Sequence, residues 1–251
     1  MTAPVFVVDG PVPGDCTYVL DGSEGRHAVS VKRLRAGEPL VLTDGRGAWS
    51  EGVVAAAEGK DRLVVEAGPL RTEAEERPRI TVVQALPKGD RGELAVETMT
   101  ETGVDAIVPW AASRCVTQWR GERGAKALGK WRATAREAGK QSRRVRFPEF
   151  PDGTGAASTK EVAALLAAAD LAVVLHEDRD AHSAALASAN LPESGEIVLV
   201  VGPEGGVSPE ELQVFNDAGA RTFRLGRSVL RTSTAGTAAV ALLLARTGRW
   251  S

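Results

Sequence analysis

The hydrophobic pattern of this chain changes its period at one charged, proline-bounded segment, and this change predicts two domains. Up to about residue 67, short apolar runs alternate with turn residues such as Asp-Gly-Arg-Gly at 44–47, a pattern typical of a small β-barrel. Residues 68–78 (GPLRTEAEERP) have the composition of a linker. After them, strand-like and helix-like runs alternate, which predicts an α/β domain with a mostly parallel sheet. We expect the barrel at residues 1–70, the linker at 71–78 and the α/β domain at 79–251.

Composition excludes several classes of protein. The 251 residues are 43% hydrophobic and 25% charged, as in ordinary globular domains rather than disordered chains. The apolar runs fall short of the roughly 18 residues of a membrane span, and the first residues lack the basic and apolar regions of a secretory signal. Cys16 and Cys115 lie far apart without clustered histidines, which argues against a metal site. We therefore expect a cytoplasmic protein that uses neither a membrane nor a metal.

The formal net charge of −2 hides two basic segments. Residues 114–146 carry 11 basic and 2 acidic side chains, and residues 221–251 carry 6 basic and no acidic ones. Such segments are typical of a surface that binds a polyanion. The alternative is a solvated surface whose charges pair with the acidic remainder of the chain, and the counts alone leave both interpretations open.

Two expected helices carry most of the candidate contacts with a polyanion. Between residues 122 and 141, apolar residues recur at helical spacing from Leu128 to Ala138, and another face of the same helix carries a basic row spaced to follow a phosphate backbone. An earlier helix is expected within the barrel, with Ser23 as its N-cap and Gly37 just past its end. This helix contains His27, and the alternative for it is a surface position that makes no contact with a polyanion. The candidate residues for contacts with a polyanion are Arg26, His27, Lys32, Arg33, Arg35, Arg114, Arg132, Arg136, Lys140, Gln141, Arg143 and Arg144.

A glycine-rich loop is the most informative chemical signal. The apolar run 196–201 leads directly into Gly-Pro-Glu-Gly-Gly at 202–206, and Ser208, Pro209 and Glu211 then form the N-cap, first-turn proline and capping-box partner of a helix. Glycines at the carboxyl end of a strand let a ligand approach the backbone closely. The loop lacks the lysine and hydroxyl of a P-loop and the G-x-G-x-x-G of a dinucleotide fold, which argues against both classes. A bare turn is the alternative.

A second loop, at residues 223–236, ends a short strand and opens the last helix. It places Arg224, Arg227 and Arg231 close to Gly226 in the sequence and ahead of threonine and serine hydroxyls. A helix that begins there offers free N–H groups and a positive dipole end to an anion. A basic cap on a core helix is the alternative, but together with the 202–206 loop the pattern favours a binding site.

In combination, several motifs resemble those of the RsmE family of small-subunit ribosomal RNA methyltransferases, within the SPOUT class. They are GPEGG after a buried strand, LGRSVLRTSTA at 225–235, ETMTETGVDAIVPWAASRCV followed by REAGKQSRR, and RHAVSVKRLRAG near the start. Many members of that family have Glu where this chain has Ser233, Lys where it has Thr98 and Leu where it has Thr102. We still expect the family's activity in spite of these three departures. They affect only which individual residues are expected to contact the RNA.

The resemblance implies a PUA-like RNA-binding barrel followed by a SPOUT domain with a carboxyl-terminal trefoil knot, which periodicity alone does not predict. It also implies S-adenosylmethionine as cofactor, no metal, a homodimer, and methylation of N3 of one uridine in the decoding region of 16S ribosomal RNA or of the small ribosomal subunit. The residues implied to bind the cofactor are Leu175, His176, Gly202, Glu204, Gly205, Gly206, Leu225, Gly226, Leu230 and Ala235.

Methylation at N3 requires removal of the proton that uridine carries there. We expect Arg231 to stabilise the developing uracil anion, because it matches the family's arginine and precedes the last helix. Glu204 is the candidate base, with solvent as the alternative acceptor. N3 lies on the pairing edge of uracil, so the target nucleotide should be single-stranded or flipped out. Two rival functions are a SPOUT methyltransferase acting on another RNA and a non-catalytic RNA-binding factor in ribosome assembly.

Overall fold

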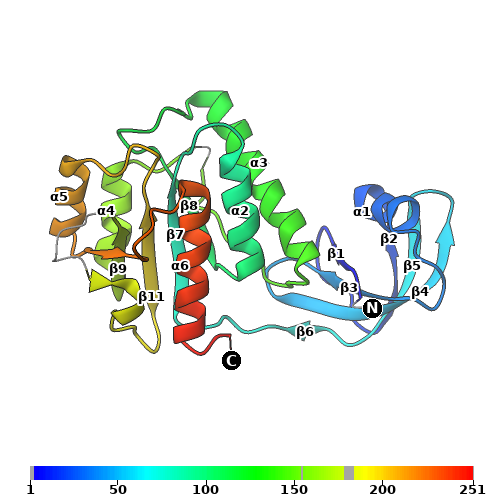
Figure 1. Cartoon of the computed structure of the whole chain (residues 1–251). Coiled ribbons are helices and arrows are strands. Elements are labelled where there is room, and N and C mark those ends of the chain that lie inside the picture. The colour runs from blue at the N-terminus through cyan, green and yellow to red at the C-terminus, as the bar shows by residue number, and fades with distance from the viewer. Residues whose placement is uncertain (1–2, 154, 178–183, 251) are drawn as a thin grey trace. The chain divides into compact units, whose positions relative to one another are not determined.

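The computed structural model describes residues 3–153, 155–177 and 184–250, which fold into two compact units (Figure 1). The first unit contains residues 1–75 and 136–147, and the second contains residues 76–135 and 148–251. The segment 136–147 joins the first unit through backbone hydrogen bonds, including Gly47 N to Val145 O at 3.0 Å and Phe147 N to Gly45 O at 2.8 Å. Contacts between such distant parts of a chain leave no periodic mark in the sequence.

The first unit is built on one sheet with the strand order β1-β3-β4-β5-β2, in which β1 and β2 occupy the two ends. β1 pairs with β3 in parallel, and the other neighbours along this order are antiparallel. Alternate residues of β5 (Leu63, Val65 and Ala67) are buried beside Phe6 and Leu40, as expected for a sheet with one apolar face. The strands are β1 (Val5–Val7), β2 (Cys16–Leu20), β3 (Pro39–Thr43), β4 (Ala48–Glu58), β5 (Arg62–Ala67) and β6 (Arg71–Thr72), the last of which pairs with β4.

The helix of the first unit is shorter than expected. It consists of α1 (Gly22–Arg26), whose N-cap is Asp21 rather than Ser23, and a π-helical turn (His27–Val31). The backbone of Arg33 adopts a left-handed conformation with φ 56°, which ends the helix, and Gly37 N then donates to Val54 O of β4. The expectation of one helix reaching Gly37 is therefore wrong, and the basic residues after Val31 lie on an irregular segment.

The second unit alternates strands and helices, as the sequence predicts. Its sheet has the order β10-β12-β9-β11-β7-β8, and every pairing in it is parallel. The short strand β10 was not expected. The elements are β7 (Arg79–Ala85), α2 (Arg91–Thr102), β8 (Ala106–Trp110), α3 (Gly121–Gln141), α4 (Thr159–Ala168), β9 (Leu171–Leu175), β10 (Ala184–Ala185), a 3-10 turn (Leu186–Ser188), β11 (Glu196–Val201), α5 (Pro209–Asp217), β12 (Arg221–Arg224) and α6 (Thr232–Arg246).

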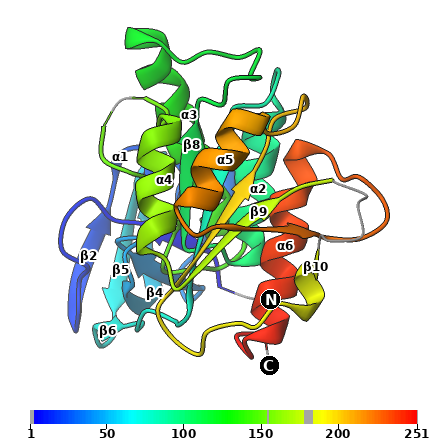
Figure 2. The ribbon, with the colours of Figure 1, turned by 90° about the vertical axis from the view of Figure 1, so that its left-hand side faces the viewer.

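Both faces of this parallel sheet are buried, so the inner strands β7, β9 and β11 are predominantly apolar. On β11, Ile197 and Leu199 point to a core shared with α2 and α6, whereas Val198 and Val200 point to a core shared with α4 and α5. Figures 1 and 2 show these helix pairs on opposite sides of the sheet. In the described part of the chain, no helix is both long and apolar enough to cross a membrane.

A local signal places the start of α5 as predicted, and α4 begins in the same way. Ser158 and Ser208 are the N-caps of α4 and α5, and each forms a complete capping box with Glu161 or Glu211. Thr98, the position where the RsmE family often has lysine, donates or accepts a 2.7 Å hydrogen bond with a threonine of α6.

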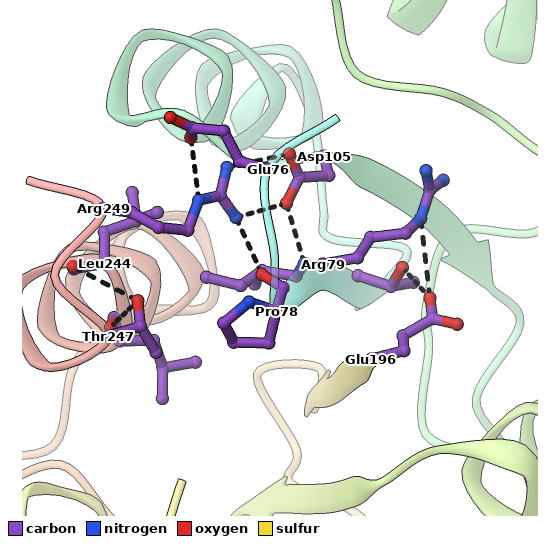
Figure 3. A network of polar contacts seen from close by, with 11 residues as sticks. Glu76, Pro78, Arg79, Asp105, Glu196, Leu244, Thr247 and Arg249 are labelled. Atoms are coloured by element: carbon purple, nitrogen blue, oxygen red, sulfur yellow. Dashed lines mark hydrogen bonds and ion pairs between the residues drawn. The ribbon is translucent and has the colours of Figure 1, made fainter. Parts of the chain in front are cut away.

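A buried ion-pair network fixes the end of α6 to the start of the sheet (Figure 3). Arg249 is bidentate to Asp105 at 2.7 and 3.0 Å, and it also donates to Glu76 Oε2 at 2.8 Å and Pro78 O at 3.0 Å. Asp105 in turn accepts the N–H of Ile80 at 2.8 Å. The side chains of Arg249 and Asp105 are only 7% and 12% exposed, so removal of Arg249 leaves the buried carboxylate of Asp105 without its cation.

We predict that Arg249→Met lowers the free energy of unfolding by about 3–5 kcal/mol, the range for a buried pair that loses one member. The matched control is Lys130→Met, which breaks an exposed ion pair with Glu93 and should leave stability almost unchanged. Urea unfolding followed by circular dichroism measures both. Equal effects of the two substitutions would show that the buried network does not stabilise the fold.

Candidate functional site

One cavity lies where three neighbouring strands of the second unit end. β9 sits between β12 and β11 in the sheet, and all three run parallel, so the segments that follow them meet at one edge. This is the edge at which open α/β sheets usually bind ligands. The cavity measures about 540 Å³, within the roughly 300–1,000 Å³ typical of small-molecule sites.

The structure brings nearly all of the predicted cofactor residues together around this cavity. Gly205 is the exception, because it does not line the cavity and its carbonyl instead accepts a hydrogen bond from Arg114 Nη1 at 2.9 Å. The candidate catalytic residue Arg231 also lines it, as the N-cap of α6. The predicted cofactor residues on the lining are Leu175, His176, Gly202, Glu204, Gly206, Leu225, Gly226, Leu230 and Ala235.

Hydrogen bonds join the segments that form the cavity. Thr232 Oγ1, in the first turn of α6, donates to Gly202 O at 3.1 Å, so the start of the last helix is tied to the glycine-rich loop. His176 N donates to Phe223 O at 3.0 Å, which continues the pairing of β9 with β12 beyond the strand end. Backbone hydrogen bonds and the hydroxyl of Thr232 therefore hold the segments of the cavity wall together.

Two glycines of the loop disfavour a side chain, for different reasons. A Cβ on Gly202 would lie 2.9 Å from Cγ2 of Val207, closer than packed atoms approach. Gly206 has φ 70°, a left-handed backbone that L-residues other than glycine adopt at a cost. Gly226 of the second loop differs, since nothing lies within 4 Å of its Cβ position.

The carboxylate of Glu204 is held by neighbouring groups. Its Oε1 accepts the N–H of Lys88 at 3.2 Å and lies 3.9 Å from Nη1 of Arg91. These two residues follow β7, the strand next to β11, so the contact connects the glycine-rich loop to the start of α2. The side chain that the sequence presents as a candidate base thus also has a structural role.

The buried carboxylate of Glu211 joins the segments next to the glycine-rich loop. Glu211, in the first turn of α5, is 5% exposed, and it accepts hydrogen bonds from Ser113 N at 2.7 Å, Ser208 N at 3.0 Å and Thr159 Oγ1 at 3.3 Å. Its capping box therefore joins three segments that all flank the carboxyl edge of the sheet. No group of three or more potential metal ligands occurs among residues 3–153, 155–177 and 184–250.

Sequence reasoning missed Arg91, which lines the cavity with Arg224, Arg227 and Arg231. Arg91 begins α2 immediately after the segment that leaves β7, so its position at the carboxyl edge was the available signal. Arg91 was not recognised because no local sequence pattern predicts the strand order that brings β7 beside β11.

The structure contradicts the prediction that Lys140 contacts RNA. In the first unit this side chain is only 2% exposed, and its Nζ donates to Glu24 Oε1 at 2.8 Å and Glu137 Oε1 at 3.1 Å. Arg136 lies 3.4 Å from the same Glu24 oxygen. An ammonium that is buried and paired is not available to a phosphate, so the basic row on α3 is interrupted.

His27 also lacks the charge that a phosphate contact needs. Burial, followed by the nearby ammonium of Lys140, lowers the pKa of His27 below its ordinary value, so the ring is neutral at pH 7. The ring stands edge-on to Phe6 with a centroid separation of 5.9 Å. The position of His27 is therefore that of a packed residue within the first unit.

The other RNA candidates keep more exposed positions. Arg132, in the second unit, donates from Nη2 to Pro151 O at 2.9 Å, and Arg144 is half-buried. The candidates with exposed side chains are Arg26, Lys32, Arg33, Arg35, Arg114, Arg132, Gln141 and Arg143.

Comparison with known families defines the class. The RNA methyltransferase domain family matches residues 74–244, and the RNA methyltransferase PUA domain family matches residues 20–67. A parallel α/β domain with its cavity at the strand ends, together with a PUA domain, confirms the predicted SPOUT class of RNA methyltransferase. The trefoil knot stays a prediction.

The relatives narrow the class further. The chain is 44% identical to ribosomal RNA small subunit methyltransferase E of Mycobacterium bovis over 100% of this chain and 94% of that protein, and 30% identical to the Bacillus subtilis protein of the same name over 87% and 86%. The crystal structure of the Neisseria gonorrhoeae protein of that name, bound to S-adenosyl methionine, has a TM-score of 0.83, with 30% identity and coverage of 98% of both chains. The chain belongs to the ribosomal RNA small subunit methyltransferase E family.

We predict that Gly202→Ala lowers the free energy of unfolding by about 1–3 kcal/mol, because the new methyl group overlaps Val207. Gly226→Ala is the matched control, since it adds the same group to open space on the same cavity and should change stability by less than about 0.5 kcal/mol. Thermal and urea unfolding measure both. If the two variants are equally stable, the glycine-rich loop is not packed as described.

Proposed function

We propose that this protein transfers the methyl group of S-adenosylmethionine to N3 of one uridine in the decoding region of 16S ribosomal RNA. The observation that carries the proposal is the cavity at the ends of β9, β11 and β12, whose lining includes nine of the residues implied to bind that cofactor. The relatives' name and the cofactor bound to the Neisseria protein support it. The exact nucleotide and atom come from the family resemblance.

The residues around the cavity fit the cofactor. Its volume suits an amino-acid nucleoside, Leu175, Leu225 and Ala235 supply apolar wall for a purine, and the loop backbones supply polar groups. The cofactor, when bound, supplies a methyl group activated by a sulfonium. The protein's own tasks are then to orient the uracil, exclude water and manage one proton.

In this proposal, Arg231 stabilises the negative charge that develops on the uracil when N3 loses its proton. It lines the cavity at the first turn of α6, where the positive end of the helix dipole adds to its own charge. A cation held beside the uracil ring lowers the free energy of the anionic state and hence of the transfer step. Glu204 lines the same cavity, and we assign it to holding the loop through Lys88, with solvent as proton acceptor.

The RNA is expected to meet both units. The PUA domain is one contact, through the exposed residues Arg26, Lys32, Arg33 and Arg35. Aromatic residues make up only 4% of the chain, so phosphate and shape contacts, rather than stacking of many bases, should position the RNA. The target base itself must leave any helix for N3 to be reached.

We further propose that the protein acts as a homodimer in the cytoplasm, where ribosomal subunits are assembled. Leu94 on α2 is 45% exposed, and Val229 and Leu230 on the cavity loop are 64% and 40% exposed. Apolar side chains exposed beside a functional cavity are typical of a surface that a partner covers. Sedimentation of the purified protein measures the oligomeric state directly.

The decisive experiment is methyl transfer from labelled S-adenosylmethionine to unmodified small ribosomal subunits and to naked 16S RNA, followed by digestion and identification of the nucleoside. We expect 3-methyluridine at one site. Label in another nucleoside or only in another RNA would identify a SPOUT enzyme of different specificity. RNA binding without any transfer would favour the non-catalytic assembly factor.

We predict that Arg231→Ala lowers kcat by about 100- to 1,000-fold, as for loss of one group that stabilises a developing anion. The side chain is exposed and makes no side-chain hydrogen bond or ion pair in the part of the chain that the structure describes, so the fold should be unaffected. Arg231→Lys keeps the charge and should restore part of the rate. Undiminished turnover of a folded Arg231→Ala protein with intact cofactor affinity would remove Arg231 from the mechanism.

A further inference from the structure

Two arginines on the cavity loop have no side-chain partner among residues 3–153, 155–177 and 184–250. Arg224 ends β12 and Arg227 follows it, and both line the cavity with exposed side chains. Within the described residues, neither side chain makes a hydrogen bond, an ion pair or an aromatic contact. By contrast, Arg221 on the same strand lies over the ring of Phe223 at 5.4 Å. No described residue holds these two guanidinium groups, and both line the cavity in which a ligand would bind.

The charges around the cavity do not balance. Its described lining contains four arginines and two carboxylates, Glu177 and Glu204. Glu204 is already shared between the N–H of Lys88 and the guanidinium of Arg91. Among the described lining residues, that leaves Glu177 against three arginines, so this described part of the lining carries more positive than negative charge. Like charges gathered around one cavity repel each other, and an anion placed among them offsets that repulsion.

The cofactor cannot be the anion that offsets this charge. S-adenosylmethionine carries one carboxylate, one ammonium and one sulfonium, so it is a net cation at pH 7. A positively charged cavity lowers its affinity for a net cation. The other proposed ligand is RNA, whose phosphates are the negative charges that arginine binds most readily.

We propose that Arg224 and Arg227 bind phosphates beside the target nucleotide, and that this contact raises the affinity of the cavity for its cationic cofactor. The inference rests on the proposed function and adds an energetic coupling between the binding of RNA and the binding of the cofactor. When phosphates neutralise the two arginines, their repulsion of the sulfonium falls. By thermodynamic linkage, the cofactor must then raise the affinity for RNA by the same factor.

The coupling should distinguish, by their charge, two ligands of nearly equal shape. S-adenosylhomocysteine, the demethylated product, lacks the sulfonium charge and so feels the arginines less. Binding of phosphates should therefore favour the methylated form over the product. Such a preference would help the protein load a fresh cofactor on the RNA and release the spent one.

The first test measures the affinities of S-adenosylmethionine and S-adenosylhomocysteine by calorimetry without RNA. Replacing both arginines by glutamine (Arg224→Gln with Arg227→Gln) should raise the affinity for S-adenosylmethionine relative to S-adenosylhomocysteine by about threefold, because two repelling charges are gone. Lys160→Gln removes an exposed charge on α4, outside the cavity, and should leave that ratio unchanged.

The second test adds a synthetic RNA with the decoding-region sequence of 16S ribosomal RNA. In the wild-type protein the RNA should raise the affinity for S-adenosylmethionine by about fivefold or more relative to S-adenosylhomocysteine, and in the double variant it should not. The salt dependence of RNA binding should also lose a slope of about 0.7 for each phosphate contact removed. Lys160→Gln should keep the wild-type slope.

The outcomes distinguish the two proposals. If neither ligand binds the wild-type protein, the proposed function fails. If both bind but their ratio responds to neither RNA nor the double substitution, the proposed function stands and the coupling is wrong. If the salt slope of the double variant equals that of the wild type, the two arginines do not bind phosphates.

Discussion

The parallel pairing of β9 with both β12 and β11 is the constraint on which the site depends. In this register Val174 lies beside Thr222 on one side and Val200 on the other, so the three strands reach the same edge of the sheet together. Loops that are far apart in the sequence then share one cavity. The last helix, α6, follows β12 and packs against α2, β7 and β11, where its first turn bonds Gly202. The cavity is thus a consequence of strand order.

Arginine has opposite roles in the second unit, and the difference lies in its partners. Arg249 is buried, paired with two carboxylates, and joins the end of α6 to the start of the sheet. Arg224, Arg227 and Arg231 are exposed at the cavity loop. A fully paired arginine adds rigidity but has no donors left for a ligand, whereas a free one keeps its donors and its charge. The sequence alone does not distinguish these roles, because all four residues belong to one basic segment.

Local features of the second unit were predictable because they depend on neighbours in the chain. The capping boxes at Ser158 and Ser208 need only residues three positions apart, and the alternation of strands and helices needs only a change in period. The 202–206 loop was recognised for the same reason. The cavity residue Arg91, the short strand β10 and the early end of the first helix depend on contacts with distant segments. No local pattern records such contacts.

The buried Lys140 shows how a count of charges overstates a nucleic-acid surface. Of the basic residues between 114 and 146, Arg114 donates to Gly205 O, Lys130 pairs with Glu93, and Arg146 donates to Glu73 O. Lys140 and Arg136 share Glu24, on which the end of α3 converges within the first unit. The exposed cations of this segment without a side-chain partner in the described chain are Arg120, Arg123 and Lys126, at the start of α3 or just before it, and Arg143, just after its end. The helical spacing correctly identified a basic helix, but the pairing decides which of its cations remain available to a polyanion.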